Sequence, residues 1–449
     1  MEDIKAGQNL NMFLIGGLTV LICFIFHLVY KAFFSTTKGD ASLTTESDSG
    51  AHVDDAVSEA TQVENRPSKS KKRAQWKGKS EFTHPWLLKN LKGHPGNVLH
   101  MDFSANGKFM AATCDDGSVI LWDVRNLNQK EHKTLRVNIP YDYASRVAWS
   151  PDSKAFIVHT ARENNIIVYK IEKKKDGAIG AATPVITFDK VHEENIVGFG
   201  ISSNGKFMMS CSSKTDMVIW DLKGQQLDRL DTYLMSTHSA KISPCGRFVV
   251  ATGFSPDVKV MEVCFTKTGE FKQVTKAFEL TGHSSGVYDV AFDVDTSHIA
   301  TISKDGTWKL YHTKIEYSRG ESPHVLETGK YTQCAASPNI ALSPNAEVLA
   351  VAVDSAVEFY DTYTGQLYDT VDNIYSGIIN YMCFDASGKY LFVCGDKVVR
   401  VLHNVCGYFT TIASCTRLLS QKQTSATTER LNNTIQSCKE TLASFGKQV

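Results

Sequence analysis

Residues 116–123 read DGSVILWD, an acidic tight turn followed by a short strand that ends in Trp-Asp. Two later stretches end in nearly the same way, with MVIWD at 217–221 and DGTWKLYH at 305–312. A turn and an alternating strand that ends in an aromatic residue therefore recur at a period of about 40–50 residues. A period of this length indicates repeated supersecondary units, each of which buries its apolar face against its neighbours.

The period and the Trp-Asp endings resemble the WD40 repeat family, whose repeats form the blades of a β-propeller. Seven such units follow one another, at residues 101–123, 147–170, 199–221, 240–262, 290–312, 340–361 and 382–403. The last unit supplies only three strands, so we expect residues 84–91 to add its outer fourth strand and remove the open edges. We therefore predict an all-β, seven-bladed WD40 β-propeller over residues 82–405.

The resemblance also implies a buried hydrogen-bond network in each repeat, formed by a histidine before the first strand, a hydroxyl on the second, the turn acid and the terminal aromatic. Carried onto this sequence, its members are His94, Asp116, Trp122, Trp220, His283, Asp305, Tyr311, Asp354 and Asp396. Lys214 stands where the third repeat needs its acid, and Met261 and Leu402 replace the terminal aromatic. We expect those blades to depend on apolar packing and to be less rigid.

A short tail, residues 1–11, precedes an uncharged stretch of 19 residues, MFLIGGLTVLICFIFHLVY at 12–30. As a helix it spans roughly 28 Å, which matches a hydrocarbon core of about 30 Å. A cleaved signal peptide is the alternative, but its apolar region is about 7–15 residues long and needs a small-residue cleavage site, which residues 30–34 do not offer. We expect a retained transmembrane helix. The lysines that follow favour a cytosolic location for the remainder of the chain.

Residues 31–81 have no hydrophobic periodicity and are rich in Ser, Thr and charge, so they are expected to form a disordered tether. The second half of the tether is basic, with Lys69, Lys71, Lys72, Arg73, Lys77 and Lys79. This run is either a solvated linker or a contact for anionic lipid or RNA, each basic residue near an anionic surface contributing about 1 kcal/mol. It also resembles a nuclear-import patch, which a membrane anchor disfavours.

The C-terminal tail, residues 406–449, contains Leu431, Ile435, Cys438, Leu442 and Phe445 at alternating spacings of four and three. This spacing predicts an amphipathic helix with a narrow apolar stripe. The helix either docks on the flank of the propeller or binds a partner helix.

Charge is balanced over the whole chain, with 48 Lys and Arg against 48 Asp and Glu among 449 residues, so total charge does not indicate nucleic acid as a ligand. Within the repeats, however, the first–second and third–fourth hairpins are basic and the second–third turns are acidic. The third–fourth hairpin of the second unit carries Lys173, Lys174 and Lys175, a candidate surface for an anionic partner together with the basic run of the tether. Hairpin lysines and turn acids are also common in the repeat family, which is the alternative explanation.

No catalytic arrangement is found. Residues 191–194 read VHEE and lack the second histidine of a zinc-protease motif, and phosphate-binding glycine loops and a nucleophile elbow are missing. Eleven cysteines occur without a Cys-x-x-Cys pair, which favours reduced thiols. We expect no enzyme activity, metal, cofactor or small-molecule substrate.

Residues 243–249, 256–260, 262–265 and 303–310 resemble one group of WD40 proteins in more detail, and the similarity extends from about residue 82 to the C-terminus. Proteins of this group are anchored in the endoplasmic reticulum membrane by a single span, with the propeller in the cytosol. The resemblance implies a non-enzymatic scaffold or adaptor in the unfolded protein response, with pancreatic ER kinase as a protein partner. It also implies association with ribosomes or mRNA, so an RNA- or ribosome-tethering protein that uses the basic segments is the alternative.

Overall fold

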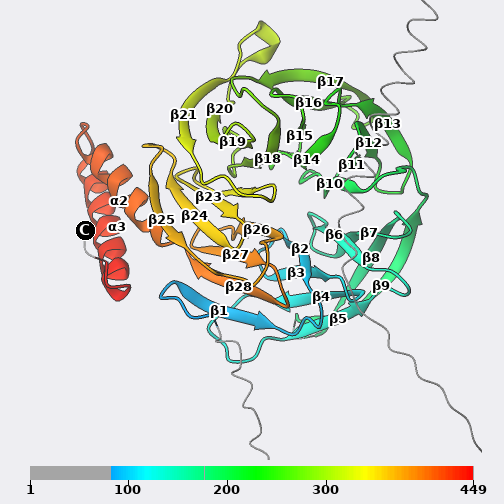
Figure 1. Cartoon of the computed structure of the whole chain (residues 1–449), viewed down its shortest axis with the longest axis horizontal. Helices are drawn as coiled ribbons and strands as arrows, with labels where there is room; N and C mark the ends of the chain where they lie inside the picture. Colours follow the sequence, from blue (N-terminus) through cyan, green and yellow to red (C-terminus); the bar gives the residue numbers. More distant parts are fainter. Residues whose placement is uncertain (1–81, 176, 448–449) are drawn as a thin grey trace, which may run out of the picture. The chain divides into compact units, whose positions relative to one another are not determined.

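The computed structural model describes residues 82–175 and 177–447, and within these ranges the chain forms seven four-stranded antiparallel blades arranged in a ring (Figure 1). The prediction of a seven-bladed all-β propeller is confirmed. The apolar segment 12–30 and the tether 31–81 lie outside the described residues. Among the residues that are described, none of the helices has the length and hydrophobicity needed to cross a bilayer.

Each blade takes four consecutive strands, numbered here from the innermost to the outermost. The first three blades contain β2 (Val98–Phe103), β3 (Phe109–Cys114), β4 (Ser118–Asp123) and β5 (Thr134–Asn138); β6 (Ala144–Trp149), β7 (Ala155–Thr160), β8 (Ile166–Lys173) and β9 (Ile179–Phe188); and β10 (Ile196–Ile201), β11 (Met208–Ser212), β12 (Asp216–Trp220) and β13 (Gln226–Asp231). The fourth and fifth contain β14 (Thr237–Ile242), β15 (Phe248–Gly253), β16 (Val258–Phe265) and β17 (Phe271–Leu280); and β18 (Val287–Phe292), β19 (His298–Ser303), β20 (Thr307–His312) and β21 (His324–Lys330), with the short 3-10 helix η1 (Tyr317–Arg319) before β21.

The last two blades contain β22 (Asn339–Leu342), β23 (Val348–Val353), β24 (Ala356–Asp361) and β25 (Leu367–Val371); and β26 (Tyr381–Phe384), β27 (Tyr390–Cys394) and β28 (Val398–His403), to which β1 (Leu87–Lys92) is added. The ring closes as expected, because β1 pairs antiparallel with β28, from Leu87 opposite Leu402 to Lys92 opposite Val398. The first and last segments of the propeller therefore share one sheet, which leaves the seventh blade without an open edge.

The strands follow from short apolar runs separated by turn residues. In β4 five of the six residues are buried, as expected for a strand with blades on both sides. The preceding hairpin turns at Gly107, whose φ of 66° is in the left-handed region that glycine adopts at low cost. At Gly329 a side chain is excluded for another reason: a Cβ atom there would lie 2.3 Å from the buried indole of Trp308.

The third and fourth blades are joined more closely than the others. Gly198 of β10 forms a parallel bridge with Ala240 of β14, so that their eight strands form one continuous sheet. A Cβ on Gly198 would lie 2.4 Å from the Ala240 Cβ and 2.7 Å from its carbonyl oxygen, so this contact requires glycine.

Two helices follow the ring, α2 (Val405–Leu419) and α3 (Ser425–Ser444). The sequence predicted α3 but not α2. Cys438 and Leu442 of α3 are buried in one cluster with Val405 and Ile412 of α2 and with strands of the sixth and seventh blades. Beyond α3, Phe445 packs against His403, and the Lys447 ammonium lies 3.0 Å from the Asp369 carboxylate. Of the two alternatives for the amphipathic helix, the structure has the docked one (Figure 1).

Candidate protein-binding surface

Alternation of strand direction gives the ring two faces. The connections between blades and the second–third turns lie on one face, here called the loop face. The first–second and third–fourth hairpins lie on the other, here called the hairpin face. Each face is a platform fixed by the blades beneath it.

Exposed apolar side chains gather on the loop face. The most exposed large hydrophobic residues of the described chain are Tyr141 at 95%, Tyr233 at 80% and Met235 at 79%, and all three lie in between-blade connections. Phe254 and Ile378, at 59% and 53%, lie in a second–third turn and a between-blade connection of the same face. Exposed aromatic and Met side chains are the types enriched at protein interfaces.

The connection between the third and fourth blades presents two of these side chains. Leu234 is fully buried, while Tyr233 and Met235 on either side of it take left-handed φ values of 54° and 64°. The Thr232 and Thr237 hydroxyls, 3.2 Å apart, join the two ends of the loop, and the Ser236 carbonyl accepts a 3.0 Å hydrogen bond from the Phe254 backbone N–H. Buried Leu234 thus fixes both neighbours outward in a conformation that costs on the order of 1 kcal/mol per residue.

A second connection presents Tyr141, again with a left-handed φ, of 62°. The next residue, Asp142, is buried, and its carboxylate accepts hydrogen bonds from the backbone N–H groups of Tyr143, Arg162 and Glu163 at 2.7–3.1 Å. Burial by itself raises the pKa of Asp142, but these donors outweigh it and hold the pKa below its usual value. The carboxylate therefore stays ionised and ties the loop of Tyr141 to the neighbouring turn.

Acidic residues surround these side chains. The second–third turns carry Asp115, Asp116, Asp257, Asp305, Asp354 and Asp396, as the topology of the repeats predicts. Asp116 pairs with Arg136 at 2.6 Å, and Ser376 donates to Asp396 at 2.8 Å. Asp354 has a left-handed φ of 50°, and its carbonyl accepts from the Ile379 N–H at 2.8 Å. The loop face is thus an apolar surface with acidic turns between its apolar side chains.

The third blade holds the most complete repeat network, and here the prediction for Lys214 is wrong. Asp216 accepts from His192 Nδ1 at 2.5 Å, and Ser210 Oγ lies 2.7 Å from His192 Nε2 and 2.8 Å from Trp220 Nε1. Lys214 instead lies in the turn and pairs with Glu194 at 3.2 Å. The acid of this repeat stands at the start of β12 rather than in the turn before it, so reading the turn alone missed it.

The spacing of the repeats contains the signal that would have found this network. His192 precedes Trp220 by 28 residues, the same interval that separates His94 from Trp122 and His283 from Tyr311. In the fifth blade His283 lies 3.0 Å from Asp305 and 2.8 Å from the Thr301 hydroxyl. Tyr311 departs from the indole pattern, because its hydroxyl donates to the Thr281 carbonyl at 3.0 Å.

The first blade does not form the network that the resemblance implies. Within the described part of the chain, neither ring nitrogen of His94 nor Trp122 Nε1 has a hydrogen-bond partner, although the two rings lie 5.9 Å apart. The reason is the residue ten positions before the terminal aromatic, which is Ala112 here and Ser210 or Thr301 in the third and fifth blades. The hydroxyl that joins histidine to indole is therefore missing.

The proposed anionic-partner surface is described only in part. Lys173, Lys174 and Lys175 are exposed at the hairpin that follows β8, and the structure shows no ion pair for them among residues 82–175 and 177–447. The other members, Lys69 to Lys79, lie outside the described residues. The same limits apply to metal sites: the described residues contain no cluster of metal-ligating side chains.

Comparison with known proteins agrees with this architecture. The family model for the WD domain, G-beta repeat, matches residues 85–123, 274–312 and 369–402, which are the first, fifth and seventh repeats. The human protein named transducin beta-like protein 2 is 41% identical over 367 residues, which are 81% of this chain and 82% of the relative. The chain belongs to the transducin beta-like protein 2 family. The mouse member is 40% identical over 395 residues, 86% of this chain and 89% of its own length.

A more distant relative is periodic tryptophan protein 2 of Arabidopsis thaliana, which is 24% identical over 328 residues, 68% of this chain and 33% of its own. Members of the transducin beta-like protein 2 family are WD40 repeat proteins, and WD40 domains mediate contacts between proteins. The ten described cysteines of this family member are free thiols, and several, such as Cys211 and Cys394, are fully buried in the blades.

Proposed function

We propose that this chain is a non-enzymatic, membrane-anchored scaffold that holds a protein partner on the loop face of its propeller. The observation that supports the proposal is the set of exposed apolar side chains on that face, above all Tyr141, Tyr233 and Met235 in strained and well-fixed loops. Large side chains that already hold one outward conformation lose little entropy on binding, which is the property of interface anchors.

The charge of the loop face limits the chemistry of the partner. Acidic turns lie between the apolar anchors, so the complementary surface carries apolar side chains flanked by Lys or Arg. We propose that this partner is a protein of the endoplasmic reticulum stress response, such as pancreatic ER kinase. The resemblance of residues 243–265 and 303–310 supports this choice, and the apolar segment 12–30 supports single-pass anchoring in the endoplasmic reticulum membrane with the propeller in the cytosol.

Partner binding is tested with the intact anchored protein fused to a proximity-labelling enzyme. We expect the triple variant Tyr141→Ser, Tyr233→Ser, Met235→Ser to lose labelling of its specific partners by at least tenfold. The matched control replaces two exposed apolar residues outside the loop face, Leu222→Ser and Val294→Ser, which are 44% and 60% exposed. Equal loss of labelling in both variants contradicts the assignment of the loop face. A partner list made only of lumenal proteins contradicts the topology.

The anchor is tested separately. A variant that lacks residues 12–30 is expected to leave the membrane pellet at alkaline pH, where the intact chain remains in it, because about 19 apolar residues are needed to hold a single span. Retention of the shortened variant in the pellet contradicts this function of the segment.

A second candidate is RNA or ribosome tethering through the basic segments, supported by three adjacent exposed lysines without ion pairs, Lys173 to Lys175. Its characteristic is a steep loss of binding with salt, since each neutralised phosphate releases about one counterion. Replacing these three lysines together with Lys69–Lys79 by Gln is expected to reduce both RNA binding and its salt dependence. An unchanged salt slope excludes this candidate.

A further inference from the structure

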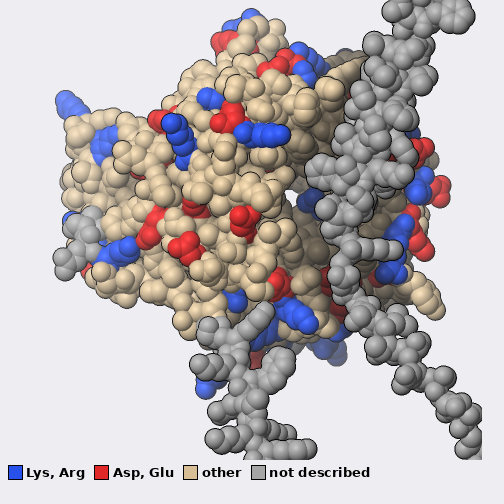
Figure 2. Space-filling model, viewed as in Figure 1, with Lys and Arg blue, Asp and Glu red and all other residues tan. Residues whose placement is uncertain are grey.

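The central channel of the ring is lined by the innermost strands. Space-filling shows a hollow at the centre of the ring with basic atoms at its edge (Figure 2). Two residues per innermost strand face this region, because the residues between them are buried in the blade cores. Nearer the loop face the seven blades contribute His100, Arg146, Gly198, Ser239, Asp289, Asn339 and Tyr381. Nearer the hairpin face they contribute Asp102, Ala148, Gly200, Lys241, Ala291, Ala341 and Cys383.

The carboxylates of this channel already have partners. Asp289 lies 3.0 Å from the Lys241 ammonium and accepts further hydrogen bonds from the Ser239 hydroxyl at 2.8 Å and the Ile340 N–H at 3.0 Å. Asp102 accepts from the Trp149 N–H at 2.7 Å, and burial raises the pKa of Asp102 to about 6, so that its negative charge is disfavoured. Neither carboxylate is available as a dedicated counter-ion for a further cation.

Arg146 is that further cation. Its guanidinium forms no hydrogen bond or ion pair with any residue of 82–175 and 177–447, although burial lowers the pKa of Arg146 and so disfavours its charge. An arginine stays protonated in proteins and has five N–H donors to satisfy. The next innermost strand has Gly198 and Gly200 at the equivalent positions, so no side chain from that blade occupies the space in front of it. A desolvated cation without a counter-ion is a site for an anion.

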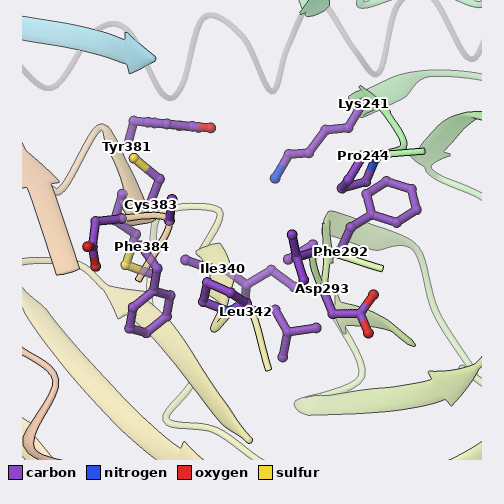
Figure 3. Close-up of a pocket in the computed structure, with 16 residues that line it drawn as sticks. Lys241, Pro244, Phe292, Asp293, Ile340, Leu342, Tyr381, Cys383 and Phe384 are labelled. Atoms are coloured by element: carbon purple, nitrogen blue, oxygen red, sulfur yellow. The ribbon is translucent and has the colours of Figure 1, made fainter. Parts of the chain in front are cut away.

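Two further donors face the same space. Figure 3 shows the Lys241 ammonium and the Tyr381 hydroxyl pointing toward each other across a cavity of about 290 Å³, which is large beside the roughly 30 Å³ share of one water molecule. The charge of Arg146 acts on Tyr381, and burial keeps the pKa of Tyr381 well above its usual value, so the phenol remains an O–H donor. The cavity is bordered by Pro244, Val294 and Pro344 of the first–second hairpins and therefore opens on the hairpin face.

We propose that the channel binds a small phosphate-type oxyanion between the Arg146 guanidinium, the Tyr381 hydroxyl and the Lys241 ammonium. The planar fork of arginine matches two oxygens of such an anion, and the phenol and the ammonium supply donors from the opposite side of the channel. The free anion enters from the hairpin face, where basic residues such as Lys108 and Lys206 are exposed, rather than from the acidic loop face. This site is independent of the proposed partner surface.

The test uses the full-length protein in detergent and inorganic phosphate as the probe. Calorimetric titration and thermal unfolding are recorded with phosphate and with chloride at equal ionic strength. Arg146→Gln is expected to weaken phosphate binding by roughly 10- to 100-fold, the effect of a charge-assisted hydrogen bond, and Tyr381→Phe by roughly 2- to 10-fold. The control Lys108→Gln removes an exposed positive charge outside the channel and leaves the affinity unchanged.

Arg146→Gln also tests itself for folding, because removal of an uncompensated buried charge does not lower the unfolding temperature measured in chloride. Phosphate that stabilises the wild type and Arg146→Gln equally overturns the proposal, and so does a wild type that binds phosphate no better than chloride. Should Arg146→Gln unfold, Tyr381→Phe decides: an affinity equal to wild type then overturns the site.

Discussion

The hydroxyl of Ser210 offers the sharpest test of how the repeats are stabilised. The geometry sets the direction of every hydrogen bond: Trp220 Nε1–H donates to Ser210 Oγ, the Ser210 hydroxyl donates to His192 Nε2, and His192 Nδ1–H donates to Asp216. Ser210 is fully buried, and the exposed fractions of His192 and Trp220 are 2% and 3%. Water cannot replace the hydroxyl without a rearrangement of the blade.

Ser210→Ala removes one oxygen and leaves two buried polar groups without a partner. Each such group costs about 1–3 kcal/mol, so the free energy of unfolding is expected to fall by roughly 2–5 kcal/mol. Urea unfolding measures this change, and an unchanged m value shows that it reflects stability rather than compactness. If the seven blades do not unfold in one step, hydrogen exchange of the amides in β11 and β12 reports the same loss locally.

The first blade supplies the reciprocal variant. Ala112 occupies the position of Ser210, and both His94 and Trp122 Nε1 lack partners there, so Ala112→Ser is expected to stabilise the protein by about 1 kcal/mol. The reasoning is refuted if Ser210→Ala changes stability by less than about 0.5 kcal/mol. It is refuted equally if Ala112→Ser destabilises as much as Ser210→Ala, because the two changes then measure side-chain volume and not hydrogen bonding.

Three further outcomes are expected. Gly329→Ala brings a Cβ within 2.4 Å of the Trp308 indole and should lower stability by about 1–3 kcal/mol, whereas Gly269→Ala, at an open turn, serves as the control for backbone strain alone. Leu442→Ala, at a fully buried position, should cost about 2–5 kcal/mol and increase hydrogen exchange in α3 before that in the blades. Burial lowers the pKa of both His94 and His159 to about 4. Because the unfolded chain binds their protons near pH 6.5, their contribution to stability is complete above that pH and declines as the pH falls toward 4. The slope is up to about 1.4 kcal/mol per pH unit for each histidine, and His159→Gln should reduce it in urea titrations across this window.

The ring and its closure were predictable from sequence because the repeat imposes them. Turn residues such as Gly107 and apolar runs such as β4 recur seven times, and a seventh unit with only three strands requires a strand from elsewhere, which β1 supplies. Helix α2 was missed since its sequence, VCGYFTTIASCTRLL, is rich in β-branched and aromatic residues with low helix propensity. Its helical form follows from burial of Val405 and Ile412 and from the cap at Asn404, which are tertiary effects.

The loop face was beyond the reach of sequence for a different reason. Tyr233, Leu234 and Met235 are all large and apolar, and nothing in the sequence indicates that only the central one is buried. Their division depends on left-handed backbone angles that the loop takes because the Thr232 and Thr237 hydroxyls meet at its base. Aromatic residues in a between-blade connection would ordinarily be assigned to the core.

Seven copies of one unit allow each position to be compared within a single chain, and this comparison separates structural positions from functional ones. At the hydroxyl position, the variation between Ser210, Thr301 and Ala112 changes only whether a network closes. At the channel position nearer the loop face, the seven blades carry seven different residues, from Gly198 to Arg146, with no chemistry in common. The repeat does not dictate that position, so an arginine there without a partner is not required by the fold. Its buried charge lowers stability unless something binds to it, which is why a ligand, rather than packing, accounts for Arg146.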